Sequence, residues 1–300
     1  MLLPFDSHVP ADEVTVVIDE QAKIFFESCK QAAKSGDKAA QFHLAWMYES
    51  GFGVEPNQES ALEWYRKSAD QGHAKAQYWM GSTFYFAQMR LFVRGVMRGD
   101  LPVMGISHDE AVAWLRKAAE QGHVEAQKDM GAECHKQDDA SQAVEWYRKA
   151  AQQGDREAQR ILGYMFQDGL GIPIDTNQAI HWYQKAAEQG DPWAQYWLGT
   201  MLETGETSST IDQAIHWYQK AAEQGIEEAQ YALGTLYING YRVRQDNVQA
   251  HMWFCLASTG LNHENQEAAK LFVRSLELIM SPSELAESQR LATEWKSLTH

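Results

Sequence analysis

The chain has 300 residues, of which 41 are acidic and 26 are basic, and its formal net charge is −15. The apolar fraction of 44% is enough for a folded core and excludes wholesale disorder. This acidity argues against nucleic acid and anionic lipid as ligands, because binding to phosphate depends on Lys and Arg, so we expect protein partners.

Residues 1–18 are predicted to be an N-terminal extension. Residues 1–6 lack the basic region and apolar run of a secretory signal, and no segment of the chain reaches the ~20 apolar residues of a membrane-spanning helix. We therefore expect a cytoplasmic protein with no membrane insertion. The run at 14–18 fits either a strand or the entry to a helix, and a helical apolar stripe begins after it.

Residues 19–280 are predicted to form a single repeat array. The phrase Gly-x-x-x-Ala-Gln recurs at Gly36, Gly72, Gly122, Gly154, Gly190 and Gly225. A second phrase, Ala-x-x-Trp followed by Tyr, Leu or Phe, recurs at Ala61, Ala111, Ala143, Ala179, Ala214 and Ala250. Recurrence at such a period indicates an array of repeated helical units, and the spacing predicts seven of them.

Each unit is predicted to contain two helices. In the first helix of one unit, Ala179, Trp182, Tyr183 and Ala186 form the apolar stripe of an amphipathic helix. Four residues before each stripe alanine stands a residue suited to cap a helix N-terminus. These predicted caps are Asn57, Ser107, Asp139, Asp175, Thr210 and Asp246. The second helix carries Ala-Gln-x-x-Leu-Gly-x-x-Tyr, whose small residues favour close helix packing.

Together these phrases resemble the Sel1-like repeat family, which is related to the tetratricopeptide repeats. The resemblance implies an all-α fold, a right-handed α/α superhelical solenoid of about seven helix-turn-helix repeats. Family members are mostly adaptors and regulators that hold other proteins, which implies a partner protein or peptide bound in a concave groove. Secreted members carry paired cysteines in every repeat; Cys29, Cys134 and Cys255 form no such pairs and are expected to be buried and inert.

An insertion around residues 85–106 breaks the spacing between Gly72 and Gly122. It is apolar, rich in Met and net positive within an acidic chain. Two interpretations stay open: a second helix extended over a neighbouring unit, or an element that docks a partner or a second copy of the chain as a homodimer. The candidate contact residues are Met89, Arg90, Leu91, Phe92, Arg94, Met97 and Arg98.

The groove itself is expected to be lined by the first helices, with selectivity at their polar positions. Because these residues are spaced i, i+3, they also fit ordinary surface contacts. The candidates are Glu63, Arg66, Glu145, Arg148, His181, Gln184, His216 and Gln219. His73 and His123 replace the Asp that follows the turn glycine and are predicted to be surface exchanges.

Residues 281–300 are predicted to be a C-terminal capping helix. Ser281, Pro282 and Glu284 form a capping box with proline at the first helical position. The apolar or small residues that follow at helical spacing are Leu285, Ser288, Ala292 and Trp295. A terminal helix with a polar outer face prevents repeat arrays from associating end to end.

No phosphate loop, nucleophile elbow, zinc-binding helix or dinucleotide fingerprint is present in the sequence. We therefore expect a non-enzymatic scaffold or adaptor with no cofactor and no metal. One alternative is an immunity-type inhibitor that binds and neutralises a toxic effector enzyme. A hydrolase is the less favoured second alternative, because it would need a cleft with converging titratable groups.

Overall fold

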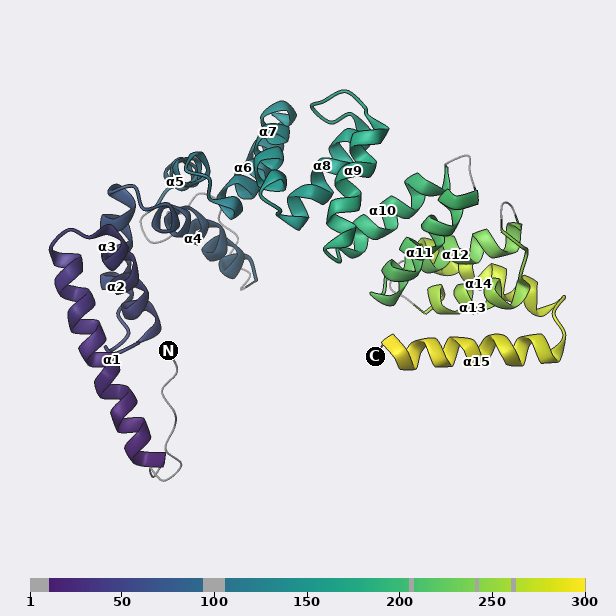
Figure 1. Ribbon diagram of the computed structural model, residues 1–300, viewed down its shortest axis with the longest axis horizontal. Helices are drawn as coiled ribbons and strands as arrows, with labels where there is room; N and C mark the ends of the chain where they lie inside the picture. The colour runs from purple at the N-terminus through teal and green to yellow at the C-terminus, as the bar shows by residue number, and fades with distance from the viewer. Residues whose placement is uncertain (1–10, 94–105, 205–207, 241–242, 260–262, 300) are drawn as a thin grey trace. The chain divides into compact units, whose positions relative to one another are not determined.

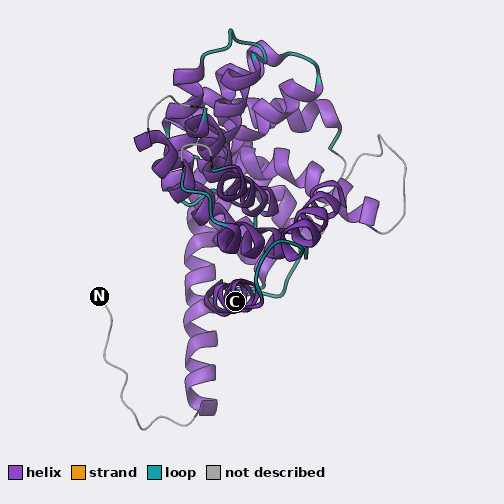
Figure 2. Ribbon diagram, turned by 90° about the vertical axis from the view of Figure 1, so that its right-hand side faces the viewer, coloured by secondary structure: helices purple, strands orange, loops and turns teal. Residues whose placement is uncertain are grey.

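The computed structural model describes residues 11–93, 106–204, 208–240, 243–259 and 263–299, and the helices in these ranges account for most of the chain (Figures 1 and 2). By contact, the chain divides into two compact units, residues 1–150 and 151–300. The described helices are α1 (Ala11–Lys34), α2 (Lys38–Ser50), α3 (Gln58–Asp70), α4 (Ala74–Val93), α5 (His108–Glu120), α6 (Val124–Lys136), α7 (Ala140–Gln152), α8 (Arg156–Asp168), α9 (Thr176–Glu188), α10 (Pro192–Glu203), α11 (Ser208–Glu223), α12 (Glu227–Asn239), α13 (Asn247–Ala257), α14 (His263–Glu277) and α15 (Pro282–Thr299).

The odd-numbered helices α1 to α13 are the predicted first helices, and the even-numbered helices α2 to α14 are the second helices. The first helices α3, α5, α9, α11 and α13 each pack on the second helix before them. This alternation confirms the all-α, α/α solenoid fold. The segment at 14–18 is the entry to a helix and not a strand, because α1 runs without a break from Ala11.

Five of the six predicted first-helix caps are confirmed. In each, a side-chain oxygen accepts a hydrogen bond from the backbone amide three residues on, and the five are Asn57, Ser107, Asp139, Asp175 and Asp246. The prediction for Thr210 is wrong. Helix α11 begins earlier, at Ser208, and places Thr210 inside its first turn.

The prediction that His73 and His123 are surface exchanges is also wrong. Each imidazole Nδ1 accepts the amide hydrogen bond three residues on, at 3.3 Å for His73 and 3.4 Å for His123, and so caps a second helix as Asp does elsewhere. The two rings lie against Phe42 and Tyr78. Burial lowers the pKa of His73, which favours the neutral ring that can accept this bond.

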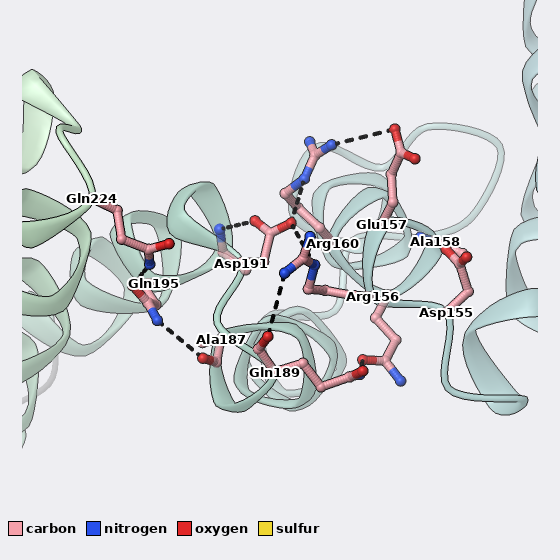
Figure 3. A network of polar contacts seen from close by, with 12 residues as sticks. Asp155, Arg156, Glu157, Ala158, Arg160, Ala187, Gln189, Asp191, Gln195 and Gln224 are labelled. Atoms are coloured by element: carbon pink, nitrogen blue, oxygen red, sulfur yellow. Dashed lines mark hydrogen bonds and ion pairs between the residues drawn. The ribbon is translucent and has the colours of Figure 1, made fainter. Parts of the chain in front are cut away.

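The glutamine of each Ala-Gln phrase is buried, and Gln41, Gln77, Gln159 and Gln195 join successive units. Gln195 Nε2 donates to the carbonyl oxygen of Ala187 at 3.1 Å, and Gln195 Oε1 accepts from Gln224 Nε2 at 2.8 Å (Figure 3). The first contact satisfies a carbonyl at the end of α9 that has no partner within its helix. The same pair of contacts recurs for Gln41, Gln77 and Gln159.

Asp191 fixes the turn between α9 and α10. Its carboxylate accepts from the amide of Ala194 at 2.8 Å and lies 3.4 Å from Nε of Arg160 and 4.0 Å from Nε of Arg156 (Figure 3). Arg156 also donates to the carbonyl oxygen of Gln189 at 3.4 Å. Helix α8 is therefore tied to the turn of the next unit by charge as well as by packing.

The glycines of α6, α8, α10 and α12 each lie under an aromatic ring of the next first helix, and Gly81 of α4 lies against Leu115. A Cβ placed on Gly199 would lie 2.7 Å from a ring carbon of Tyr218, and one on Gly163 would lie 2.8 Å from the ring of Tyr183. Real Cβ atoms do not approach other atoms this closely. The contact confirms that the small residues of the second helices permit close helix packing.

Candidate protein-binding groove

The insertion begins as an extension of α4. This helix has 20 residues against 13 in α8, so its backbone continues for about two more turns and includes Met89 to Phe92. The side chains of residues 84–93, and all of Arg94, Met97 and Arg98, lie outside the described residues. The use of the insertion to bind a partner or a second copy stays a prediction.

Of the two candidate pairs in residues 1–150, the first does not form the expected i, i+3 contact. Glu63 accepts from Lys67 Nζ at 2.6 Å, whereas Arg66 donates to Glu110 of α5 at 2.6 Å. The second pair keeps the i, i+3 contact, with Arg148 3.9 Å from Glu145. The Arg66 ion pair therefore bridges two successive first helices, α3 and α5.

In residues 151–300, two of the four polar candidates line one cleft. Gln184 of α9 and His216 of α11 stand at its rim, and the cleft has a volume of about 300 Å³. The other lining residues are Ile180, Leu198, Leu202, Gln213 and Trp217. His181 and Gln219 do not line it. We name this cleft the α9/α11 groove.

Sequence position explains why this groove is open. Gln184 and Gln213 hold the repeat positions of Arg66 and Glu110, which form the ion pair across α3 and α5. Neutral amides replace the two charges in the α9/α11 groove. Gln184 donates instead along its own helix to Glu188 at 2.9 Å. The rim therefore offers hydrogen-bonding groups above an apolar floor.

A lysine covers the tryptophan of most first helices, a feature that the sequence reasoning missed. Lys220 Nζ lies 5.5 Å from the ring centroid of Trp217, three residues earlier in α11. The same arrangement joins Trp64 to Lys67, Trp114 to Lys117, Trp146 to Lys149 and Trp182 to Lys185. The recurring Trp-x-x-Lys spacing is the signal that predicts it. These cation–π contacts give each aromatic face a polar cover.

A sequence profile of the Sel1 repeat matches residues 38–73, 74–123, 124–155, 156–191, 194–226 and 227–260. The chain belongs to the Sel1 repeat family. Each match begins with a second helix and ends after the next first helix, so the Sel1 repeats are offset by one helix from the units predicted from the sequence. Helices α1, α14 and α15 lie outside the matched residues.

Solved structures of similar chains share the Sel1 fold. A protective antigen of uropathogenic Escherichia coli with an SLR fold has a TM-score of 0.62 and 31% identity, over 91% of this chain and 56% of the antigen. A Sel1 repeat protein of Oxalobacter formigenes has a TM-score of 0.60 and 29% identity, over 81% of this chain and 98% of that protein.

Two putative sel1-like repeat-containing proteins of Acanthamoeba polyphaga mimivirus are 40% identical over 62 residues and 34% identical over 84 residues. The matched segments are 21% and 28% of this chain but only 11% and 15% of those longer proteins. Among the described residues, none of the helices is both long and apolar enough to cross a membrane.

The C-terminal Sel1 units are covered by α15, which packs on α13 (Figure 1). The predicted capping box is present, since Glu284 accepts from the amide of Ser281 at 2.7 Å and Ser281 Oγ accepts from the amide of Glu284 at 3.4 Å. The side chains that face the Sel1 units include those predicted, namely Leu285, Ser288, Ala292 and Trp295. The outer face carries Arg290 in ion pairs with Glu287 and Glu294.

Titratable groups converge where α15 crosses α13, but they form a junction between helices. His251 Nδ1 lies 2.7 Å from Ser288 Oγ, and its Nε2 lies 4.0 Å from the Glu277 carboxylate. This set resembles a hydrolase triad, yet Ser288 has no exposed surface, so a substrate has no access to its hydroxyl. Cys255 Sγ is 3.7 Å from the same ring, and burial raises the pKa of this thiol to about 11.

Burial has the same effect on the other two cysteines. Cys29 and Cys134 are buried, and desolvation raises the pKa of both thiols. The prediction that Cys29 and Cys134 are buried is confirmed, and a raised pKa keeps a thiol protonated and poorly nucleophilic. Within the described ranges, no three His, Cys, Asp or Glu side chains are grouped so as to hold a metal ion.

Acid is expected to destabilise the junction of α13 and α15. Burial lowers the pKa of His251 although Glu277 opposes the shift, so the neutral ring stabilises the fold above about pH 6.5, and this contribution is lost as the pH falls below that value. Thermal unfolding at pH 7 and pH 5 should show a larger fall in Tm for the wild type than for His251→Gln. His73 is present in both proteins, so its contribution to the difference between their Tm changes cancels. An equal fall in both would contradict a role for His251.

Proposed function

We propose that this chain is a non-enzymatic protein-interaction scaffold that binds a segment of a partner protein in the α9/α11 groove. The observation that carries the proposal is the meeting of Gln184 and His216, from successive Sel1 repeats, above an apolar floor. The Sel1 fold supports a protein partner, and the net charge of −15 argues against nucleic acid.

The chemistry of the groove suits a peptide segment. Ile180 and Leu202, above the buried Leu198, supply apolar surface for an anchor side chain, which is the main source of binding free energy at such interfaces. The amide of Gln184 and the imidazole of His216 can hydrogen-bond to polar groups of the partner and select among apolar segments. Both side chains are exposed at the rim.

The test is affinity capture from native cells with the full chain as bait. A double variant with Gln184→Arg and His216→Glu should reduce the captured partner at least about tenfold relative to the wild type, because it places two charged side chains at the groove rim. Gln289→Arg, on the exposed face of α15, is the matched control and should capture as the wild type does.

Circular dichroism and Tm must be unchanged in both variants for the comparison to count, and both sites are exposed. Undiminished capture by the double variant would contradict the proposal. The identity of a partner that is lost would also decide between an adaptor and an inhibitor of a toxic enzyme. Only an inhibitor would have as its partner an enzyme whose activity falls on binding.

A further inference from the structure

The groove between α11 and α13 is equivalent to the α9/α11 groove and lies one Sel1 repeat further along the chain. Its walls and floor hold Ile215, Tyr237 and Trp253 at the repeat positions of Ile180, Leu202 and Trp217. The two grooves are thus built from the same elements, two first helices with a second helix beneath them.

An amphipathic helix, α15, already lies along this second groove, where it packs on α13. Leu291, Ala292 and Trp295 pack against the buried cluster that contains Trp253, and Ile215 and Tyr237 pack against the same cluster. Trp295 meets Trp253 edge to face, with ring centroids 4.7 Å apart. The chain itself therefore demonstrates that a groove of this construction accepts a helix with an aromatic anchor.

The direction of the bound helix follows from its neighbours. Glu284, near the start of α15, lines a cleft with Asp212 and Ile215 of α11. Trp295 and Lys296, near its end, line another cleft with Glu223 at the end of α11. Helix α15 therefore runs alongside α11 in the same direction, as a helix-in-groove ligand does.

One sequence difference accompanies the occupied groove. Leu256 stands in α13 at the repeat position of Lys220, so Trp253 lacks the lysine that covers Trp217, and Trp295 covers it instead. The lysine cover is thus present in α3, α5, α7, α9 and α11, and it is replaced by leucine in α13, on which α15 packs. A surface cation–π contact is weak and easily exchanged for an aromatic side chain.

We propose that the α9/α11 groove takes an amphipathic helix of a partner protein, aligned as α15 is, with an aromatic anchor over Trp217. This inference rests on the proposed function and names the partner's chemistry. The anchor displaces Lys220 from the indole face. In α15, Ser288 lies against His251 of α13. Ile215 holds the repeat position of His251 in α11, so the partner helix carries an apolar residue at the position of Ser288.

The probe is a fluorescent synthetic peptide with the sequence of residues 282–299 and the change Ser288→Leu, titrated into the full chain and followed by anisotropy. We expect saturable binding that weakens at least about tenfold in Gln184→Arg, a loss of about 1.4 kcal/mol. Lys220→Leu, which copies Leu256, should tighten binding several-fold. Gln289→Arg should leave it unchanged, and a peptide with Trp295→Ala should bind at least about tenfold more weakly.

The absence of saturable binding up to about 1 mM, which corresponds to about 4 kcal/mol, would overturn the inference. Binding that is equal in the wild type and in Gln184→Arg would also overturn it, because the peptide would then occupy another surface or exchange with α15. If Gln184→Arg loses the native partner while the peptide fails to bind, the proposed function stands and only the helical form of the partner is wrong.

Discussion

Replacing Gln195 with Met is expected to lower the free energy of unfolding by about 2 kcal/mol. Methionine fills the same space but can neither donate to the Ala187 carbonyl oxygen, as Gln195 does at 3.1 Å, nor accept from the Gln224 amide, as Gln195 does at 2.8 Å. The Ala187 carbonyl keeps the bond from the Gly190 amide at 2.9 Å, but water does not reach the position of Gln195, which is 4% exposed. Urea denaturation followed by circular dichroism measures the change.

The matched control is Gln184→Met, because Gln184 is exposed and hydrogen-bonds only along its own helix to Glu188. This variant should change the free energy of unfolding by less than about 0.5 kcal/mol. Equal effects at the two positions would show that the buried glutamines are not what joins successive Sel1 units.

Replacing Gly199 with Ala is expected to destabilise the chain by about 2 kcal/mol. In an open helix the same change would stabilise by about 1 kcal/mol, since alanine is the better helix former. The sign is reversed here because the new Cβ would lie 2.7 Å from a ring carbon of Tyr218, which is itself fully buried. The measurement is again urea denaturation.

The neighbouring residue supplies the control for the glycine. Thr200 is half-buried in the same helix but does not lie under the ring, and Thr200→Ala should cost less than about 1 kcal/mol, with the loss of its hydrogen bond to Trp197. A gain in stability in Gly199→Ala would mean that α10 and α11 can move apart at low cost, and that the ring contact does not hold them.

The sequence was sufficient to predict the features that repeat locally. Five first-helix caps, the two-helix unit and the glycines that lie against the next helix all follow from short spacings that recur in most units. The buried glutamines were visible as a phrase, but their partners were not. Gln224 comes 29 residues after Gln195, and only the stacking of units brings the two amides together.

The residues of the candidate groove were also predictable only in part. The expectation that polar first-helix positions line a groove found Gln184 and His216, but it did not distinguish them from Arg66, whose ion pair lies across α3 and α5. That distinction depends on the charge at the facing position of the next unit. Leu256 replaces the recurring lysine, and this substitution is the sequence signal for the position that α15 covers.

Hydrogen–deuterium exchange of the full chain, with and without its captured partner, tests the binding surface most directly. The α9/α11 groove predicts slower exchange of backbone amides in α9 (176–188) and α11 (208–223) in the complex, with α3 and α5 unchanged. Slower exchange confined to residues 85–106, with α9 and α11 unchanged, would contradict the proposal and place the partner on the insertion instead.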